Sequence, residues 1–333
     1  MLTFFLKYVF LYYLKKKNFF LSNFLFYNDI ISKFFKKGFT NMIKHFLTIA
    51  AITLGASALD DNYLFEVSKQ VKTYNSSKLT STVNIHKTSK SSCTEFARTV
   101  PRKISTPSDI KIFKEKKIEP IHYTNTISLN NLQVSEKKQK FFHMILPAIL
   151  ISKQRLKAKR NRVNNIINTL NPTVNEIEFL EKQYKTYKTT DNKELLSRMK
   201  THPVSIVLAQ AAIESAWGES RFFKEGNNIF GMWSYNKNEP RIKAKGNRNG
   251  KSIYVRKYSS LSDAIDHYFE VIGRGAYKNF RKQRDITKDP LQLVKYLVNY
   301  CELKEKYTHK LKKFIITNRL RKFDEFKIDK KYL

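Results

Sequence analysis

One carboxylate, Glu214, stands out as a candidate catalytic group because of its place in residues 203–233, PVSIVLAQAAIESAWGESRFFKEGNNIFGMW. Apolar or small residues recur there at helical spacing: Val204, Val207, Leu208, Ala211, Ala212 and Ser215. Pro203 suits the first turn of this helix, and Gly218 predicts its end one turn after Glu214. A carboxyl group beside an apolar face is partly desolvated, which raises its pKa. A carboxyl that stays protonated near neutral pH can serve as a general acid, for example in cleavage of a glycosidic bond.

Aromatic and amide side chains follow this helix directly. The only two tryptophans of the chain, Trp217 and Trp233, lie in this stretch. Aromatic rings stack on sugar faces, and amides bind hydroxyl and acetamido groups. The residues that we predict to bind a glycan are therefore Trp217, Asn228, Phe230, Trp233 and Tyr235, with Tyr254 and Tyr258 as further candidates. The alternative interpretation is a solvated glutamate at a helix end, followed by aromatic residues that belong to the core.

The stretches LAQAAIESAWGESRF and GNNIFGMW resemble the glucosaminidase domain of peptidoglycan hydrolases, and in particular its Bax-like branch. The resemblance extends roughly over residues 133–323 and includes EKKQKFFHMILPAI, DNKELLSRM and YSSLSDAIDHYF. It implies a mainly α (α+β), lysozyme-like fold with a helical lobe, a small β-hairpin lobe and a cleft between them. It also implies that Glu214, the glutamate of the ES dipeptide, is the catalytic acid. An active-site tyrosine of such domains falls on Tyr307 in YCELKEKYTHKL, with Tyr300 as the second choice.

A second catalytic carboxylate is not identified by any pattern in the sequence. Glu239, in the expected hairpin, is our first candidate, and Glu225 and Asp263 follow. Bax-like proteins often carry an acidic residue where this chain reads SIYVRK, so Tyr254 departs from their pattern. An alternative is substrate assistance, in which the 2-acetamido oxygen of N-acetylglucosamine attacks its own anomeric carbon.

Other kinds of catalytic chemistry find little support in the sequence. The seven histidines never fall in ligand pairs such as HExxH, and we expect no metal and no cofactor. No G-x-S-x-G motif or phosphate-binding glycine loop is present. Cys93 and Cys301 are compatible with a disulfide in an oxidising compartment and equally with two free thiols.

The N-terminal third of the chain has the composition of processing and linker segments. Residues 42–58 have the layout of a secretory signal peptide, with Lys44, an apolar run and Ala56-Ser57-Ala58, so residues 1–41 are interpreted as an upstream translation artefact. An uncleaved N-terminal anchor is the alternative. Residues 59–130 are rich in Ser, Thr, Lys and Asn and are predicted to form a basic flexible linker. The catalytic domain is expected over residues 131–323, followed by a tail at 324–333.

Helical patterns dominate that domain. A helix is expected from Glu136 to about residue 170, bent or divided at Pro147. A second helix should start after Thr173, a third should span residues 192–199, and Ser262 should cap one that continues to Ile272. Further helices are expected from Pro290 through residue 301 and over residues 303–320. Between them, Asn249-Gly250 predicts the turn of a β-hairpin.

The chain has 333 residues, a formal net charge of +35 and a pI near 10.0, which suggests a polyanionic partner. We predict an exported, periplasmic or cell-envelope peptidoglycan hydrolase that cleaves β-1,4 glycosidic bonds of glycan strands by carboxylic acid catalysis. We predict no nucleic-acid partner and no stable membrane span after removal of the signal peptide. The sequence does not indicate an oligomeric state. The alternatives are a lytic transglycosylase, an amidase, a non-catalytic wall-binding protein and, less favoured, a nucleic-acid binder.

Overall fold

The computed structural model describes residues 98–248 and 250–333, and within them the protein is mainly helical. The expected artefact at 1–41 and signal peptide at 42–58 lie outside the described residues, as does the linker up to residue 97. No helix in the described part is both long enough and apolar enough to cross a membrane.

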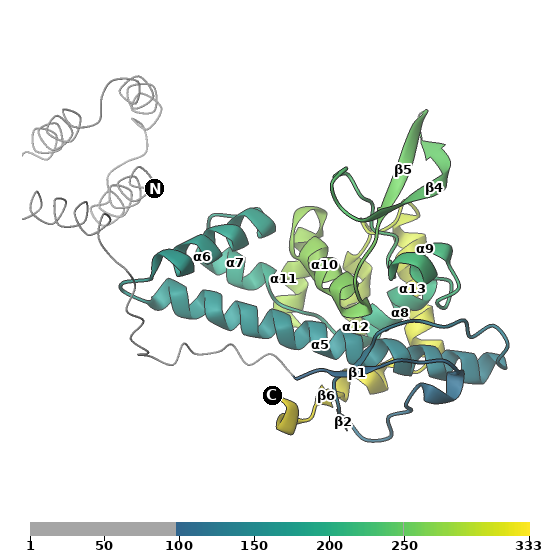
Figure 1. The fold of residues 1–333 in the computed structure, drawn as a ribbon. Coiled ribbons are helices and arrows are strands. Elements are labelled where there is room, and N and C mark those ends of the chain that lie inside the picture. The colour runs from purple at the N-terminus through teal and green to yellow at the C-terminus, as the bar shows by residue number, and fades with distance from the viewer. Residues whose placement is uncertain (1–97, 249) are drawn as a thin grey trace, which may run out of the picture. The chain divides into compact units, whose positions relative to one another are not determined.

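The longest element of the described residues is α5 (Val134–Asn168), and four other helices pack along it (Figure 1). Residues 141–152 of α5 are all buried, and α8, α10 and β3 are among the elements that contact α5. Pro147 lies inside the segment, yet α5 continues through it. Of the two expected effects of Pro147, division of the helix is wrong, and a bend stays a prediction; burial of the surrounding segment helps to offset the one missing backbone hydrogen bond.

Five further α-helices contribute, with α5, to one hydrophobic core. They are α6 (Val174–Tyr187), α7 (Asn192–Arg198), α8 (Val204–Glu214), α10 (Leu261–Gly273) and α13 (Lys304–Thr317). The capping box predicted at Thr173 is present, with Glu176 as its partner. Ser260, rather than Ser262, caps α10, because the serine side chain accepts a hydrogen bond from the Asp263 amide at 3.1 Å.

Shorter elements complete the helical part. They are α9 (Arg221–Gly226), α11 (Lys278–Ile286), α12 (Pro290–Leu293) and the 3-10 turns η2 (Pro107–Asp109), η3 (Gly275–Tyr277), η4 (Val294–Tyr296), η5 (Leu320–Glu325) and η6 (Lys330–Tyr332). The helix expected from Pro290 to residue 301 is thus broken into α12 and η4.

The predicted hairpin is formed by β4 (Arg241–Arg248) and β5 (Lys251–Arg256), which pair antiparallel. Arg248 lies opposite Lys251, and Gly250, in the turn between the two strands, has a φ of 72°. The hairpin projects from the helices at the top of Figure 1. The mainly helical fold with a small β-hairpin lobe is confirmed.

Residues 98–130 are packed against the helices, so the prediction that the flexible linker extends to residue 130 is wrong for this part. The arm contains β1 (Val100–Arg102), β2 (Lys117–Ile118) and β3 (Ile121–Tyr123), and β1 pairs parallel with β3. Seven of its apolar side chains are buried: Ile104, Ile110, Phe113, Ile118, Ile121, Tyr123 and Leu129. The Phe113 amide also donates a hydrogen bond to Nδ1 of His143 on α5 at 3.0 Å.

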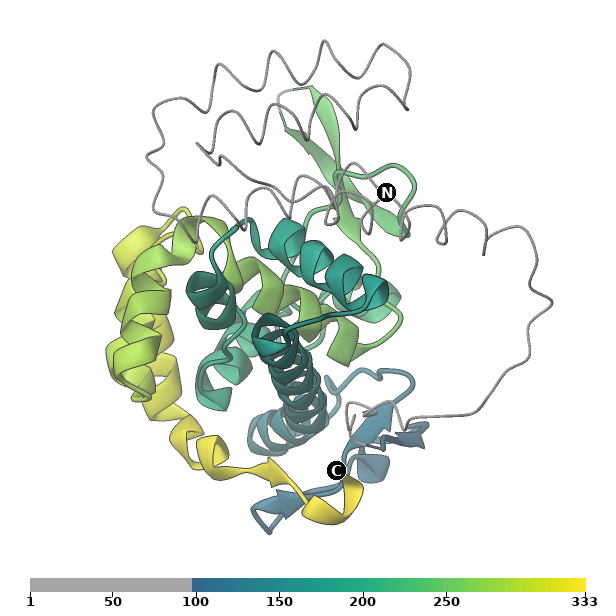
Figure 2. The same ribbon diagram turned by 90° about the vertical axis from the view of Figure 1, so that its left-hand side faces the viewer.

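The C-terminal residues join the same region. Strand β6 (Lys327–Ile328) pairs parallel with β2, so residues 324–333, expected as a tail, are part of the fold. Figure 2 shows the N-terminal strands in blue and the C-terminal segment in yellow on one side of the helices. The folded unit therefore reaches beyond the expected limits of 131 and 323 at both ends.

Candidate active site

Helix α8 places Glu214 at the edge of the core. Residues 204–212 of α8 are all buried, and the helix contacts α5, α13 and η5; all but Ser205 and Gln210 in this stretch are apolar. Glu214 is its last residue and is only partly buried. The side chain thus belongs to a helix that is almost entirely buried, yet lies at the end of that helix, where burial is partial.

An unusual turn ends α8 directly after Glu214. Ala216, Trp217 and Gly218 have φ values of 53°, 61° and 84°, three successive residues in the left-handed region. The Ser215 hydroxyl stabilises this turn: it donates to the Ala211 carbonyl at 2.6 Å and accepts from the Gly218 amide at 2.9 Å. A side chain at Gly218 would meet the Phe223 ring, because a Cβ there would lie 3.2 Å from its Cε1. Positive φ at non-glycine residues costs free energy and is concentrated at functional sites.

The carboxyl group of Glu214 accepts a hydrogen bond from Tyr307 on α13. The Tyr307 hydroxyl donates to Glu214 Oε1 at 2.9 Å. Burial raises the pKa of Glu214, although the Tyr307 hydrogen bond and the nearby charge of Lys310 act in the opposite direction. The raised pKa shifts Glu214 toward the protonated form that a general acid requires, and the hydrogen bond brings together the two residues expected to act.

Tyr307 is itself held in place. It is 3% exposed, and its ring stacks on Tyr300 with centroids 5.5 Å apart and planes inclined by 12°. Burial raises the pKa of Tyr307, and the Glu214 carboxylate raises it further, so Tyr307 stays protonated and remains a donor. Tyr300, the second choice from the sequence, stacks behind Tyr307, and no hydrogen bond is formed by its buried hydroxyl.

Glu239 is engaged at the base of the hairpin. Its carboxylate forms an ion pair with Arg256 at 2.5 Å and accepts a hydrogen bond from the Ser234 hydroxyl at 2.7 Å. Partial burial would raise the pKa of Glu239, but these hydrogen bonds outweigh it and hold the pKa below its usual value. Glu239 is thus a paired group whose ionised form is favoured, it has no contact to Glu214 among the interactions of the described residues, and its role as the second acid stays a prediction.

The two other candidates for a second acid are also paired. Glu225 forms an ion pair with Arg221 one turn away on α9 at 3.3 Å and is half exposed. Asp263 pairs with Arg155 of α5 at 3.1 Å. Neither contacts Glu214 or Tyr307 among the interactions of the described residues.

Two of the predicted glycan-binding residues are enclosed in the core. Asn228 is 1% exposed, and its amide bridges backbone groups: Nδ2 donates to the carbonyls of Met232 and Arg256, and Oδ1 accepts from the Met232 amide. Phe230 is 6% exposed and stacks on Tyr268 at 4.4 Å. Because these side chains are already surrounded by protein, the structure contradicts the prediction that they contact a sugar.

Trp217 packs inward as well. Its ring lies against Phe141 and Phe142 of α5 and Phe314 of α13, with centroids 5.3–5.7 Å apart. Lys138 covers it at 5.5 Å. Trp217 has a positive φ and its ring packs on the core. These ring contacts stabilise the turn that follows Glu214.

Trp233 and Tyr235 remain as exposed aromatic residues. They are 39% and 84% exposed, and their rings lie 6.1 Å apart. Trp233 forms a β-bridge with Val255, which attaches it to the base of the hairpin, and Arg248 lies over its ring at 5.4 Å. Tyr254 on β5 is covered by Arg241 at 3.9 Å. Trp233 and Tyr235 thus present ring faces that could stack on a sugar.

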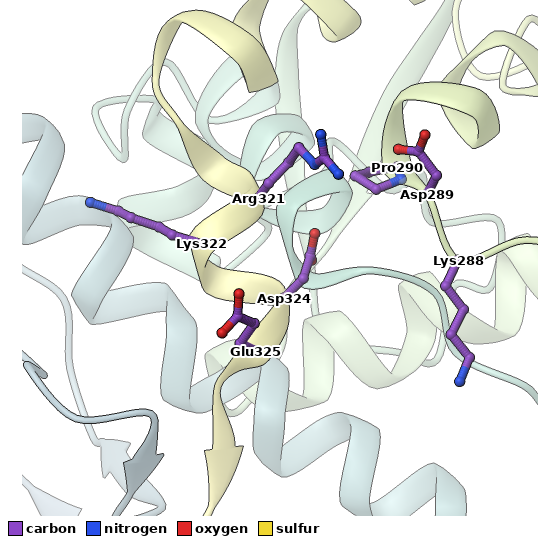
Figure 3. A pocket seen from close by; sticks show the side chains of 7 residues that line it. All are labelled: Lys288, Asp289, Pro290, Arg321, Lys322, Asp324 and Glu325. Carbon is purple, nitrogen blue, oxygen red and sulfur yellow. The ribbon is translucent and has the colours of Figure 1, made fainter.

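A hollow of about 670 Å³ lies elsewhere, between α12 and η5 (Figure 3). Its carboxylates serve the fold: Asp324 accepts from the Ser205 hydroxyl, Glu325 pairs with Lys116, and Asp289 accepts from the Leu291 amide. The hollow contains none of the predicted catalytic residues, so it is not the proposed site.

Metal ligands are not gathered in the part of the chain that the structure describes, where no group of three His, Cys, Asp or Glu side chains could hold an ion. Cys301 is a free thiol, and Cys93 lies outside the described residues.

Three residues behind the site were not found from the sequence: Gln210, Tyr268 and His202. The amide of Gln210 donates to the Tyr307 hydroxyl at 3.1 Å, and the Tyr268 hydroxyl donates to Gln210 Oε1 at 2.6 Å. His202 Nε2 lies 2.8 Å from the Tyr268 hydroxyl. Gln210 could have been noticed, because it is a polar residue one helical turn before Glu214 within an apolar run. Tyr268 is 58 positions from Gln210 and 66 from His202, so no local pattern links it to either residue.

The candidate site thus holds a partly buried carboxyl that accepts a hydrogen bond from a tyrosine, an arrangement that suits a general acid. Residues 189–320 match the model of the glucosaminidase family, described as mannosyl-glycoprotein endo-beta-N-acetylglucosaminidase. This segment therefore matches the glucosaminidase family, and the resemblance inferred from the sequence is confirmed.

Two curated relatives are similar to the chain over part of their length. Protein bax of Escherichia coli (strain K12) is 34% identical over 94 residues, 27% of this chain and 31% of the relative. Exo-glucosaminidase LytG of Bacillus subtilis (strain 168) is 32% identical over 89 residues, 25% of this chain and 32% of the relative. The chain thus spans about a third of the length of these relatives.

Among solved structures, the catalytic domain of the autolysin Auto from Listeria monocytogenes aligns at 20% identity, over 50% of this chain and 97% of that chain, with a TM-score of 0.33.

Proposed function

We propose that the protein is a peptidoglycan hydrolase that cleaves β-1,4 glycosidic bonds next to N-acetylglucosamine by general acid catalysis. The observation that carries this proposal is the Glu214 carboxyl, partly buried and hydrogen-bonded to Tyr307 at 2.9 Å. The glucosaminidase family match over residues 189–320 supports the same reaction class. Substrate and family together favour action at the cell envelope, outside the cytoplasm.

In this mechanism Glu214 gives its proton to the oxygen of the leaving sugar while an oxocarbenium-like state develops. Tyr307 donates to Oε1 and therefore stabilises the carboxylate that the proton transfer leaves behind. Trp233 and Tyr235 would bind the sugar chain through their exposed rings. Because Glu239 is paired with Arg256, substrate assistance by the acetamido group remains the alternative to a second protein carboxylate.

The product separates hydrolysis from its alternatives. We expect purified peptidoglycan digested with the purified protein to release muropeptides with a free reducing end at N-acetylglucosamine, as mass spectrometry would show. Fragments lighter by one water would indicate a lytic transglycosylase, in which an intramolecular hydroxyl replaces water. Released stem peptides would indicate an amidase. Binding to the polymer without any product would indicate a wall-binding protein.

Removal of the tyrosine hydroxyl should shift the pH dependence of cleavage. Activity requires protonated Glu214, so it falls as the pH rises through the pKa of this group. Tyr307→Phe removes a hydrogen bond that favours the ionised carboxylate, so the pKa of Glu214 should rise and the alkaline limb should move upward by about one pH unit. The measurement is kcat/KM against pH for the two proteins, with Tyr332→Phe as the control. An unchanged or downward-shifted limb would contradict this role.

A further inference from the structure

We propose that Gln210, Tyr268 and His202 are positioning residues, which fix the direction of the Tyr307 hydrogen bond so that Oε2 of Glu214 is the oxygen that carries the catalytic proton. This inference rests on the proposed function. The four hydrogen bonds from Glu214 to His202 form one unbranched series through the core between α8, α13 and α10.

The direction of each bond follows from the number of hydrogens available. Tyr307 has one hydroxyl hydrogen and donates it to Glu214 Oε1 at 2.9 Å, so its oxygen can only accept from Gln210. The amide NH₂ of Gln210 is the donor in that bond, which leaves its carbonyl oxygen for Tyr268. All donors in the series thus point toward the catalytic carboxyl.

The last bond fixes the tautomer of His202. The single hydroxyl hydrogen of Tyr268 is used on Gln210, so the remaining contact, 2.8 Å long, requires His202 to donate from Nε2. Nδ1 is then the bare acceptor, and it is buried without a partner. Burial lowers the pKa of His202 well below its usual value, and the nearby charges of Arg284 on α11 and Lys153 on α5 act in the same direction, so the ring is neutral.

The reverse direction is unfavourable. In it, Glu214 would donate from Oε1 to Tyr307, each following donor would turn round, and His202 would carry its hydrogen on Nδ1. That N–H would be buried without an acceptor, which costs more than an unpaired acceptor does. The unpaired Nδ1 therefore biases the whole series toward one direction, and Oε1 of Glu214 is kept as an acceptor.

A consequence follows for the acid itself. Oε1 receives the Tyr307 hydrogen in either charge state of the carboxyl, so a proton on Glu214 must reside on Oε2. The other titratable groups around the carboxyl are Lys310 on α13, which favours its ionised form, and the buried hydroxyls of Tyr268 and Tyr300. The series thus presents one defined oxygen to the leaving group.

The test combines a pH profile with a double-mutant cycle. Tyr268→Phe removes the hydroxyl that orients Gln210, so the Tyr307 bond should weaken and the alkaline limb of kcat/KM should move upward by about 0.4–1 pH unit. In a Tyr307→Phe background the same substitution should move it no further, because it acts only through Tyr307. The control is Tyr187→Phe, a fully buried tyrosine whose hydroxyl has no partner. Equal shifts in both backgrounds, or no shift, would overturn the proposal.

A second measurement does not depend on activity. A long-range proton–nitrogen NMR spectrum of the unaltered protein should show neutral His202 with its hydrogen on Nε2, assigned by loss of the signal in His202→Gln. An Nδ1–H tautomer or an imidazolium would refute the series even in an active enzyme. Conversely, the expected tautomer in a protein that cleaves no glycan would refute the proposed function and leave the hydrogen-bond series intact.

Discussion

Glu214→Gln should abolish cleavage of peptidoglycan while leaving the fold intact. Glutamine keeps the shape of the side chain and can still accept the Tyr307 hydrogen bond, but it has no proton of suitable acidity to give. General acid catalysis contributes about 10²–10⁴-fold to a rate, so kcat should fall by about that factor. Binding of the variant to the polymer should persist, because Trp233 and Tyr235 are untouched. Release of muropeptides and a pull-down with insoluble peptidoglycan measure the two effects.

Although Glu214→Gln should lose activity, it should not lose thermal stability. The pKa of Glu214 is raised in the folded protein, so the folded state holds this proton more tightly than the unfolded chain. Its contribution to stability therefore falls as the pH rises through that pKa. Glutamine does not ionise, and we expect a Tm at least equal to that of the parent above that pH.

Glu225→Gln provides the matched control for the same chemical change. Glu225 lies on α9 in a half-exposed ion pair, which contributes little to stability. Full activity in Glu225→Gln together with lost activity in Glu214→Gln supports the assignment. Activity retained in Glu214→Gln would transfer the chemistry to another residue.

A chain that begins at residue 131 should fail to fold cooperatively, whereas a chain that begins at residue 98 should fold. The shorter chain lacks the seven buried side chains of the arm and both small parallel pairings. Truncating one buried Ile or Leu to Ala already costs about 2–5 kcal/mol. The total free energy of unfolding of a protein is about 5–15 kcal/mol. The stability lost with the whole arm should therefore exceed the total stability of the domain. Thermal unfolding followed by circular dichroism compares the two chains.

Single substitutions provide a graded form of the same experiment. Ile121→Ala removes a fully buried side chain of β3 and should lower the free energy of unfolding by about 2–5 kcal/mol. Ile286→Ala makes the same change at a residue that is 78% exposed and should have little effect. Equal effects of the two substitutions, or a cooperative transition in the chain from residue 131, would show that the arm is dispensable.

Local patterns in the sequence predicted those parts of the fold that local chemistry determines. The capping box at Thr173 defined the start of α6, and the apolar run before Glu214 defined α8. Asn249-Gly250 predicted the hairpin because few other residue pairs suit such a turn. The pairing of Glu214 with Tyr307 came from resemblance to a family, since the two residues are separated by 93 positions.

Contacts between distant residues could not be predicted in this way. The arm has buried residues at irregular intervals, and β2 pairs with a strand about 210 positions later, so no period marks it as folded. Asn228 and Phe230 are residue types that occur in sugar-binding loops. Asparagine can equally bridge backbone groups of a turn, and phenylalanine can equally pack in a core. Only the positions of Met232, Arg256 and Tyr268 distinguish these uses.

The strand pairing that joins the start and the end of the folded unit has a practical consequence. Beside the β2–β6 pair, the amide of Arg98 donates to the carbonyl of Tyr332 at 2.9 Å. A short peptide could therefore join residue 333 to residue 98, and new ends could be opened at Gly250 in the hairpin turn. Such a circular permutant should keep its core, and it would allow the unit to be anchored to a surface through the hairpin instead of the arm.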